Sequence, residues 1–379
     1  MLVGVYPTLP ASAPLRRARP RYFPLDQGGA SLTHLGRGAV WLALRAAGLG
    51  PGSRIAMPAY HCGSEVEAAR LAGLEIDFYR VDSALRVDEE DLARAAAACD
   101  ATYLISHFGF PMAAVPGGGS GKLIEDAAHA LFSCDGDAPI GSRGHCAIFC
   151  PRKSLGVPDG GALLVKGGPT AAPVGRPGRK AIARSTTSLL AGRAALSRVR
   201  PLRGLAAGFI ARTSRADRAA RAGTLTETVI GEWDLEVSDM EAAASRPARL
   251  TEMLVRRVDP DAIRARRRRN YELLRDELAE FAPAPYRELP DGVAPLYFPA
   301  LVADRPAAIA ALLSHGVRAI EIWPVPHPLL DRERFAELEP ARRRLIALPA
   351  HQDLDEWHMR VVLDAAKGVL RPAARRGLD

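Results

Sequence analysis

"CAIFCPRKSLGVPDGGALLV", residues 146–165, places a lysine between two short apolar runs. The runs 146–150 and 161–165 are predicted to be buried strands that are close enough to pair. Lys153 follows the first run in a chain that has 51 Lys and Arg residues, of which only five are lysines. A deprotonated lysine can attack a carbonyl group, whereas arginine stays protonated. This position therefore becomes a candidate for carbonyl chemistry.

Helical and extended patterns alternate upstream of this stretch. Helices are expected at 37–48, 64–73 and 88–98, and strands at 54–60, 74–82, 102–108 and 122–126. Such alternation predicts an α/β fold of three layers, in which helices cover both faces of a mostly parallel sheet.

The chain is expected to divide into an N-terminal arm, a large domain and a small domain. Residues 1–30 are proline-rich and irregular, and residues 31–250 would form the large domain, with a basic helical excursion at 167–225. Residues 251–379 would form a smaller C-terminal α/β domain that begins with a long helix at 259–281.

The net charge of +8 is compatible with several classes of partner. Aromatic residues make up only 6% of the chain and no nucleic-acid motif is present, so anionic small molecules are favoured over nucleic acids. The excursion at 167–225 has two interpretations: a basic amphipathic helix on a membrane surface, or a helical segment with a solvated arginine face, which is favoured.

The expected cellular location depends on whether the sequence contains a transmembrane run or a secretory signal. No run of about 18 apolar residues exists, so no transmembrane helix is expected. The N-terminus does not resemble a secretory signal, and five cysteines fit a reducing compartment, so a cytoplasmic protein is expected. The sequence "HCAIFC" (145–150) is interpreted as a strand with buried thiols rather than a metal site, and no metal is expected.

Three sequence features make different chemical demands on one edge of the sheet. Asp126 ends the predicted strand 122–126, and Lys153 follows the strand 146–150. Gly36 and Gly38 lie at the N-terminus of the helix 37–48, where backbone N–H groups and the helix dipole favour an anion. Pyridoxal 5′-phosphate (PLP) makes all three demands, because it needs a lysine for its Schiff base, a carboxylate at its ring nitrogen and a phosphate site.

The sequence resembles the DegT/DnrJ/EryC1/StrS aminotransferases, which are fold-type I PLP enzymes. The stretches that carry the resemblance are "LGRGAVWLALRAAGLGPGSRIAMPAYHC", "LIEDAAHAL", "AIFCPRKSLGVPDGGALLV", "IRARRRRNYELL" and "LPAHQDLDEW". They occur in the family's order within residues 31–370. The resemblance implies a homodimer with sites at the subunit interface.

The resemblance also implies roles for individual residues. Lys153 would form the Schiff base and act as the catalytic acid and base, Asp126 would hold the pyridine nitrogen, and His129 would neighbour the ring or its hydroxyl. Gly38 and Ala39 would give backbone N–H groups to the phosphate. Tyr60 or His61 would flank the ring. Trp323 and His327 are interpreted either as the mouth of a substrate site or as a structural turn.

The expected function is the transfer of an amino group from an amino acid such as glutamate to a keto-sugar, possibly nucleotide-linked, or to a related carbonyl compound. Polysaccharide or antibiotic biosynthesis would use such a reaction. The sequence departs from the family at "VPDGG" (157–161), at Ala39 and at Ile148. These departures leave two alternatives: a PLP enzyme of another reaction type on a non-sugar substrate, or a basic membrane-surface or scaffold protein with a vestigial site.

Overall fold

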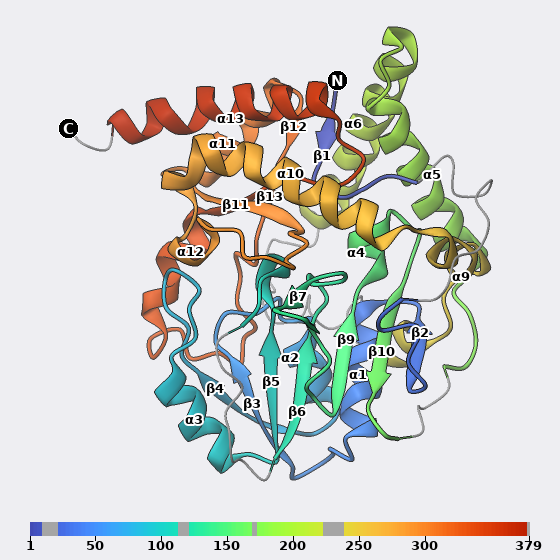
Figure 1. The fold of residues 1–379 in the computed structure, drawn as a ribbon, viewed down its shortest axis with the longest axis vertical. Helices are drawn as coiled ribbons and strands as arrows, with labels where there is room; N and C mark the ends of the chain where they lie inside the picture. The colour runs from blue at the N-terminus through green and yellow to red at the C-terminus, as the bar shows by residue number, and fades with distance from the viewer. Residues whose placement is uncertain (10–21, 113–120, 169–172, 223–238, 377–379) are drawn as a thin grey trace.

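The computed structural model describes residues 1–9, 22–112, 121–168, 173–222 and 239–376. A large sheet forms the lower half of the molecule in Figure 1, and a smaller sheet with long helices lies above it. No helix among the described residues is both long enough and apolar enough to cross a membrane.

The large sheet has seven strands in the order β2-β10-β9-β6-β5-β3-β4. Its strands are β2 (Ala30–Thr33), β3 (Arg54–Pro58), β4 (Glu75–Tyr79), β5 (Ala101–Ile105), β6 (Lys122–Asp126), β9 (Cys146–Phe149) and β10 (Gly161–Val165). Neighbours from β9 to β4 pair in parallel, while β10 is antiparallel to both β9 and β2. The predicted pairing of the two strands around Lys153 is therefore confirmed.

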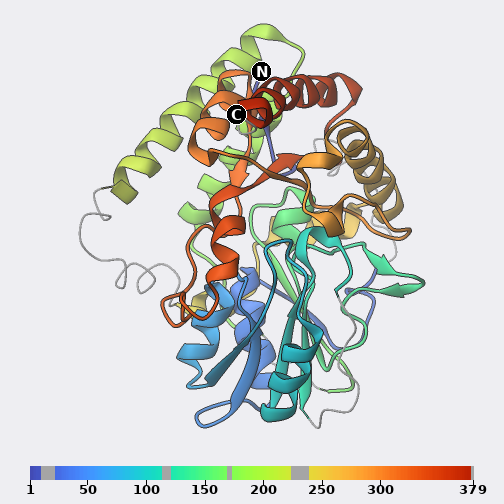
Figure 2. The same cartoon turned by 90° about the vertical axis from the view of Figure 1, so that its left-hand side faces the viewer.

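Helices cover both faces of this sheet, which explains why β5, β9 and β10 are buried along their whole length. α1 (Gly36–Ala46) and α2 (Ser64–Leu71) lie on one face, and α3 (Glu89–Ala98) lies on the other (Figures 1 and 2). α3 begins where the Asp88 carboxylate accepts a hydrogen bond from the N–H of Asp91, as is typical of aspartate before the first turn of a helix. The three-layer α/β prediction is confirmed.

The parallel arrangement brings the candidate residues to one edge. β6 ends at Asp126, and β9 is followed directly by α4 (Pro151–Leu155), which carries Lys153. β2 runs in the same direction as β9, because each is antiparallel to β10, so α1 also starts at this edge. Ligands of open α/β sheets bind at the carboxyl ends of the strands, and this is where the three features meet.

The smaller sheet is antiparallel, in the order β11-β14-β13. Its strands and helices are β11 (Tyr297–Leu301), β13 (Ile320–Glu321), β14 (Leu345–Pro349), α10 (Pro260–Leu278), α11 (Arg305–Ser314), α12 (Glu339–Arg344) and α13 (Glu356–Arg376). Within the segment predicted to be an irregular arm, β1 (Val3–Gly4) pairs in parallel with β12 (Val317–Arg318). The boundaries near residues 30 and 250 remain a prediction.

The basic excursion forms two helices. α5 (Arg179–Ala195) and α6 (Arg200–Ala222) pack against each other and project from the upper part of the molecule (Figures 1 and 2). The large unit also contains the hairpin of β7 (Cys134–Asp135) and β8 (Ala138–Pro139), and the short helices α8 (Met240–Ala244) and α9 (Arg249–Leu254).

Candidate active site

A cavity of about 240 Å³ opens at the carboxyl edge of the large sheet. Lys153, Asp126 and His129 all line it, together with Gly36 and Arg37 from the start of α1. The lysine and the carboxylate, which lie 27 positions apart in the sequence, thus line the same cavity. Among the residues predicted for cofactor binding, these three are the ones that the structure brings together.

Lys153 is held by a short helix whose position is fixed from two sides. The buried guanidinium of Arg267 on α10 donates to the carbonyl oxygen of Ser154, at 2.9 Å. On the other side, the buried carboxylate of Asp159 accepts hydrogen bonds from the N–H of Ala248, at 2.9 Å, and from the hydroxyl of Thr251. The "VPDGG" departure from the family thus supplies an anchor between the lysine loop and α9.

The charge state of Lys153 results from opposing effects. Burial lowers the pKa of its ammonium group, but the nearby thiols of Cys150 and Cys62, with a smaller contribution from Asp126, outweigh burial and raise it. Its Nζ lies 3.0 Å from Nε2 of His129. Burial and the positive charge of Lys153 lower the pKa of His129 well below its ordinary value, so the imidazole is neutral. Because Nδ1 of His129 accepts the N–H of Phe108 at 3.3 Å, the neutral imidazole carries its proton on Nε2, which faces Nζ of Lys153.

Asp126 is a buried carboxylate with two hydrogen-bond donors. The hydroxyl of Tyr103 donates to Oδ2 at 2.7 Å, and the N–H of Ala128 donates to Oδ1 at 2.8 Å. Burial raises the pKa of Asp126, although these bonds and Lys153 oppose the rise. A cationic ring nitrogen in the cavity would remove this cost, since an opposite charge stabilises the ionised form.

Glu65 on α2 is a second buried carboxylate in the cavity wall, which the sequence analysis missed. Its Oε1 accepts the N–H of Cys62 at 2.8 Å, and its Oε2 accepts the hydroxyl of Ser64 at 3.3 Å. Burial, with a further contribution from Asp126, raises its pKa from 4.5 to about 7. In the sequence, Glu65 lies three positions after Cys62 in the first turn of a predicted helix. A glutamate at such a position usually caps the helix, so the pattern does not indicate a residue of the cavity wall.

Replacing Glu65 by glutamine should change how the stability of the cofactor-free protein depends on pH. Because the folded protein binds the Glu65 proton more tightly than the unfolded chain does, the free energy of unfolding falls as pH rises from about 4.5 to about 7. A shift of this size corresponds to roughly 3 kcal/mol. E65Q should abolish most of this fall, and it keeps an oxygen for the N–H of Cys62.

Urea unfolding of both proteins at pH 5 and pH 8 measures the effect. E75Q is the matched control, because Glu75 is an exposed glutamate that pairs with Arg54 at the surface. An E65Q protein that loses as much stability between these pH values as the wild type would contradict the assignment.

The aromatic wall of the cavity differs from the prediction. The indole of Trp323 stacks on His129, with ring centroids 5.5 Å apart, and lines the cavity. Tyr60 lies behind Trp323 and donates its hydroxyl to the carbonyl oxygen of Ile322, while His61 stacks on Phe78. Neither Tyr60 nor His61 lines the cavity, so Trp323 takes the place that was predicted for them.

His327 has a structural role. Its Nε2 lies 3.0 Å from a carboxylate oxygen of the buried Glu67. Its backbone N–H donates to Nε2 of His61, at 3.2 Å. Of the two residues interpreted as a possible substrate mouth, Trp323 therefore faces the cavity and His327 supports the turn.

The residues predicted to bind the phosphate, Gly38 and Ala39, do not line the cavity, whereas the residues just before them do. The N–H groups of Gly38 and Ala39 donate to the carbonyl oxygen of Leu35, and neither residue lines the cavity. Gly38 is required for packing, because a Cβ atom there would lie 2.1 Å from the carbonyl oxygen of Ala243 in α8. Gly36 and Arg37 occupy the first turn of α1, and both line the cavity.

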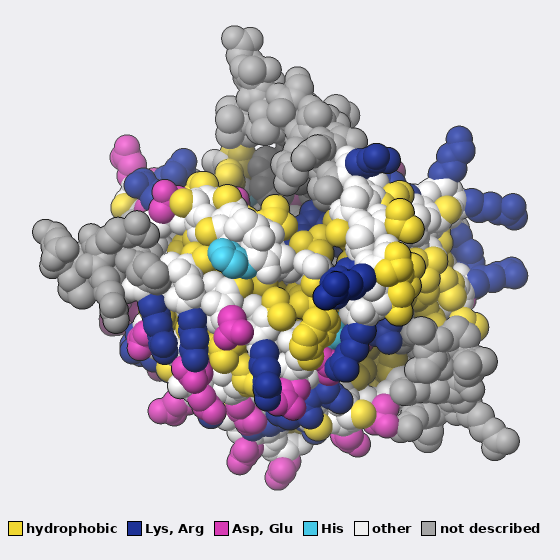
Figure 3. Space-filling view, turned by 90° about the horizontal axis from the view of Figure 1, so that it is seen from above, with side chains coloured by type: hydrophobic (Ala, Val, Ile, Leu, Met, Phe, Trp, Pro, Cys, Tyr) yellow, Lys and Arg dark blue, Asp and Glu magenta, His cyan; other side chains and the backbone are white. Residues whose placement is uncertain are grey.

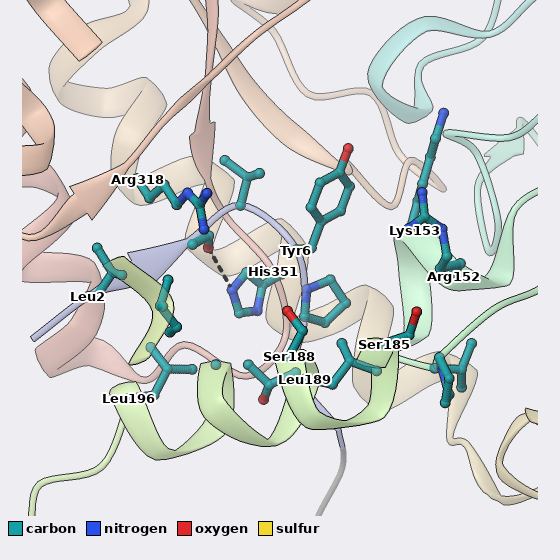
Figure 4. Close-up of a pocket in the computed structure, with 18 of the residues that line it drawn as sticks. Leu2, Tyr6, Arg152, Lys153, Ser185, Ser188, Leu189, Leu196, Arg318 and His351 are labelled. Atoms are coloured by element: carbon teal, nitrogen blue, oxygen red, sulfur yellow. Dashed lines mark hydrogen bonds between the residues drawn. The ribbon is translucent and has the colours of Figure 1, made fainter. Parts of the chain in front are cut away.

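A larger cavity of about 490 Å³ borders Lys153 on its other side. Figure 4 shows Arg318, His351 and Leu2 on one side of this space, and Arg152 and Lys153 on the other. Tyr6 lies between them, and α5 closes the space from below through Ser185, Ser188 and Leu189. Its lining is mostly apolar, with the charged groups Arg152, Arg184, Arg318 and Lys153 at its borders.

The residues present fit PLP. Lys153 offers a primary amine, Asp126 offers a buried carboxylate, and Gly36 and Arg37 offer a helix start and a guanidinium to an anion. The raised pKa of Asp126 indicates a carboxylate whose burial is unfavourable without a cation. This donor set, in a cavity at the strand ends, defines a fold-type I PLP-dependent enzyme.

The comparison with protein families names the group within this class. Residues 32–174 match the sequence model of the DegT/DnrJ/EryC1/StrS aminotransferase family. The resemblance to this family, the aminotransferase class and the PLP dependence predicted from the sequence are therefore confirmed. No curated protein is similar enough to this chain to be matched with it.

Solved structures share the fold across most of the chain at low sequence identity. A DegT DnrJ EryC1 StrS aminotransferase from Brucella abortus is 19% identical, with a TM-score of 0.58, over 89% of this chain and 85% of that one. The putative sugar aminotransferase Spr1654 from Streptococcus pneumoniae, in its PMP form, is 14% identical, with a TM-score of 0.60, over 92% and 88%. The sugar aminotransferase CalS13 from Micromonospora echinospora is 18% identical, with a TM-score of 0.56, over 89% and 87%.

Proposed function

We propose that this protein transfers an amino group from an amino acid such as glutamate to a keto-sugar, or to a related carbonyl compound that carries an acidic group. The observation that carries the proposal is that Lys153 and Asp126 line one cavity at the strand ends of an aminotransferase domain. The sugar acceptor is supported by the names of similar structures, among them two sugar aminotransferases.

Each residue around the cavity has a distinct task in this reaction. PLP, when bound, supplies an aldehyde that links to amines and a ring that draws electrons from the neighbouring carbon. Lys153 is the attachment point, and its Nζ moves the proton at the substrate carbon that carries the nitrogen. Asp126 holds a positive charge at the ring nitrogen, while Gly36 and Arg37 bind the phosphate. Trp323 and His129 form the wall that excludes water.

The larger cavity supports an acidic substrate. It adjoins Lys153 and has three arginines at its borders, Arg152, Arg184 and Arg318. Guanidinium groups bind carboxylates and phosphates through paired hydrogen bonds. Glutamate and a phosphate-bearing sugar both present such groups. A homodimer in the cytoplasm, with sites near the subunit interface, completes this proposal.

Two half-reactions test the function. Incubation of the PLP-loaded protein with glutamate should convert the cofactor to its amino form. The absorbance of protein-linked PLP at the violet end of the visible spectrum should fall, and 2-oxoglutarate should form. Addition of a nucleotide-linked keto-sugar should restore the starting spectrum and release an amino-sugar. If no amino acid from a panel of donors produces the amino form, the aminotransfer proposal fails, and the alternative of another PLP-dependent reaction on a non-sugar substrate replaces it.

Replacing Arg37 by alanine should weaken cofactor binding by about 10-fold or more, because a charged hydrogen bond to phosphate is lost. The dissociation constant of PLP, followed by absorbance, measures this. The binding of pyridoxal, which has no phosphate, should be the same in both proteins.

R45A is the matched control, since Arg45 lies near the other end of α1 and pairs with Glu241. If R37A retains PLP as tightly as R45A does, the phosphate does not bind at Arg37.

A further inference from the structure

The positive charge of this protein is concentrated in the helical hairpin formed by α5 and the beginning of α6. Residues 179–213 contain eight of the 51 basic residues and none of the 43 acidic ones, which leaves 43 of each sign in the remainder of the chain. The net charge of +8 is therefore the charge of this hairpin. Such a localised excess is the electrostatic pattern of a surface that binds an anionic partner.

The hairpin also exposes apolar side chains. Leu202, Leu205 and Phe209 on α6 are 47%, 76% and 42% exposed. Spacings of three and four residues place them on one face of the helix. Leu190 on α5 and Val199 between the helices are also more than half exposed. Seen from above, hydrophobic and basic side chains lie next to each other on the side of the molecule where the hairpin lies (Figure 3).

We propose that residues 179–213 dock this protein on a membrane surface rich in anionic lipid. An amphipathic helix with arginines beside an exposed stripe of Leu and Phe lies in the interface between headgroups and acyl chains. The arginines meet the anionic headgroups, and Leu205 and Phe209 enter the apolar layer. The hairpin does not span the bilayer.

The other occupants of this surface are less favoured by its chemistry. Nucleic acid would complement the charge but would leave the exposed leucines and Phe209 in water. A second copy that packed the same face against itself would bring two clusters of eight positive charges together. Residues 179–213 contain no acidic residue to offset this repulsion, although Arg198 pairs with Asp355. Anionic lipid satisfies both the charge and the apolar stripe.

The hairpin's position links docking to the active site. Ser185, Ser188 and Leu189 of α5 line the cavity beside Lys153, so the same helix forms part of the substrate space (Figure 4). Docking would therefore hold this cavity close to the lipid headgroups. A carbonyl substrate at the membrane surface would reach Lys153 from there.

Sedimentation of the PLP-loaded, full-length protein with vesicles tests the proposal. The protein should pellet with vesicles of phosphatidylcholine and phosphatidylglycerol at 3:1 in low salt, and it should stay in solution with phosphatidylcholine alone. High salt should release it, since exposed charges are screened. The double variants L205S/F209S and R200Q/R212Q should each bind at least about 10-fold more weakly.

Control variants carry changes of the same kind elsewhere on the surface. L313S alters an exposed leucine on α11, and R266Q/R269Q removes two charges from α10; both should bind vesicles as the wild type does. No pelleting with anionic vesicles, or equal weakening by controls and hairpin variants, would overturn the proposal. It would also be overturned if L205S/F209S left vesicle binding intact but converted a dimer to a monomer, or if duplex DNA bound more tightly than the vesicles.

Discussion

Replacing Lys153 by arginine should abolish aminotransfer, with kcat reduced by at least about 10⁴-fold, while the protein remains folded. Arginine keeps the positive charge beside Asp126 but cannot lose a proton and join to an aldehyde. The absorbance that PLP gains on joining the protein should be missing as well. K153A should recover part of its activity when a small amine such as methylamine is added, because the amine replaces the missing Nζ.

Lys166 provides the matched control for this substitution. It follows the strand that pairs with β9, and its Nζ donates to the carbonyl oxygen of Ser142 at the surface. K166R should retain wild-type kcat and the wild-type spectrum. If K153R turned over at a rate close to that of K166R, the assignment of the attachment lysine would be wrong.

Replacing Asp126 by asparagine should lower kcat by about 10²- to 10³-fold, because the variant loses a preorganised charge at the ring nitrogen. The Oδ1 atom of asparagine still accepts the Ala128 N–H, and its NH2 group can donate to the hydroxyl oxygen of Tyr103. Since burial raises the pKa of Asp126, the charged form is unfavourable in the cofactor-free protein. The neutral variant should therefore unfold at the same temperature as the wild type or at a higher one.

This combination separates a chemical role from a structural one. The matched control is E125Q, since Glu125 neighbours Asp126 on β6 but accepts the N–H groups of Arg143 and Gly144 instead of facing the cavity. E125Q should leave kcat near the wild-type value. A D126N protein with wild-type kcat, or one that is inactive only because it does not fold, would contradict the role assigned to Asp126.

The fold could be predicted from the sequence because the pattern of the large sheet is strong. Strands such as β6 and β10 coincide with the predicted ranges 122–126 and 161–165, since short buried apolar runs between turns leave little choice. The β7–β8 hairpin and β1 were not predicted. Strands of two residues have too few positions for an alternating pattern to be visible.

Lys153 and Asp126 could be predicted to meet because one follows a strand and the other ends one, and parallel strands bring their ends together. His129 was predicted from the family resemblance. The remainder of the site depends on contacts between distant segments. Trp323 reaches the cavity from the loop after β13. The sequence around it does not predict this contact. A glycine at a helix start can serve either phosphate binding or close packing, and the sequence does not distinguish the two. The close approach of α8 shows that Gly38 serves packing.

The central claim is that the amine of Lys153 is where PLP is attached, and borohydride reduction tests it most directly. The PLP-loaded protein is reduced, digested and analysed by mass spectrometry for the peptide that carries the cofactor. The account predicts a single modified peptide that contains residues 150–155, with the added mass on Lys153. A modification on Lys122, Lys166 or any other lysine, or no modification in a protein that has bound PLP, would contradict it.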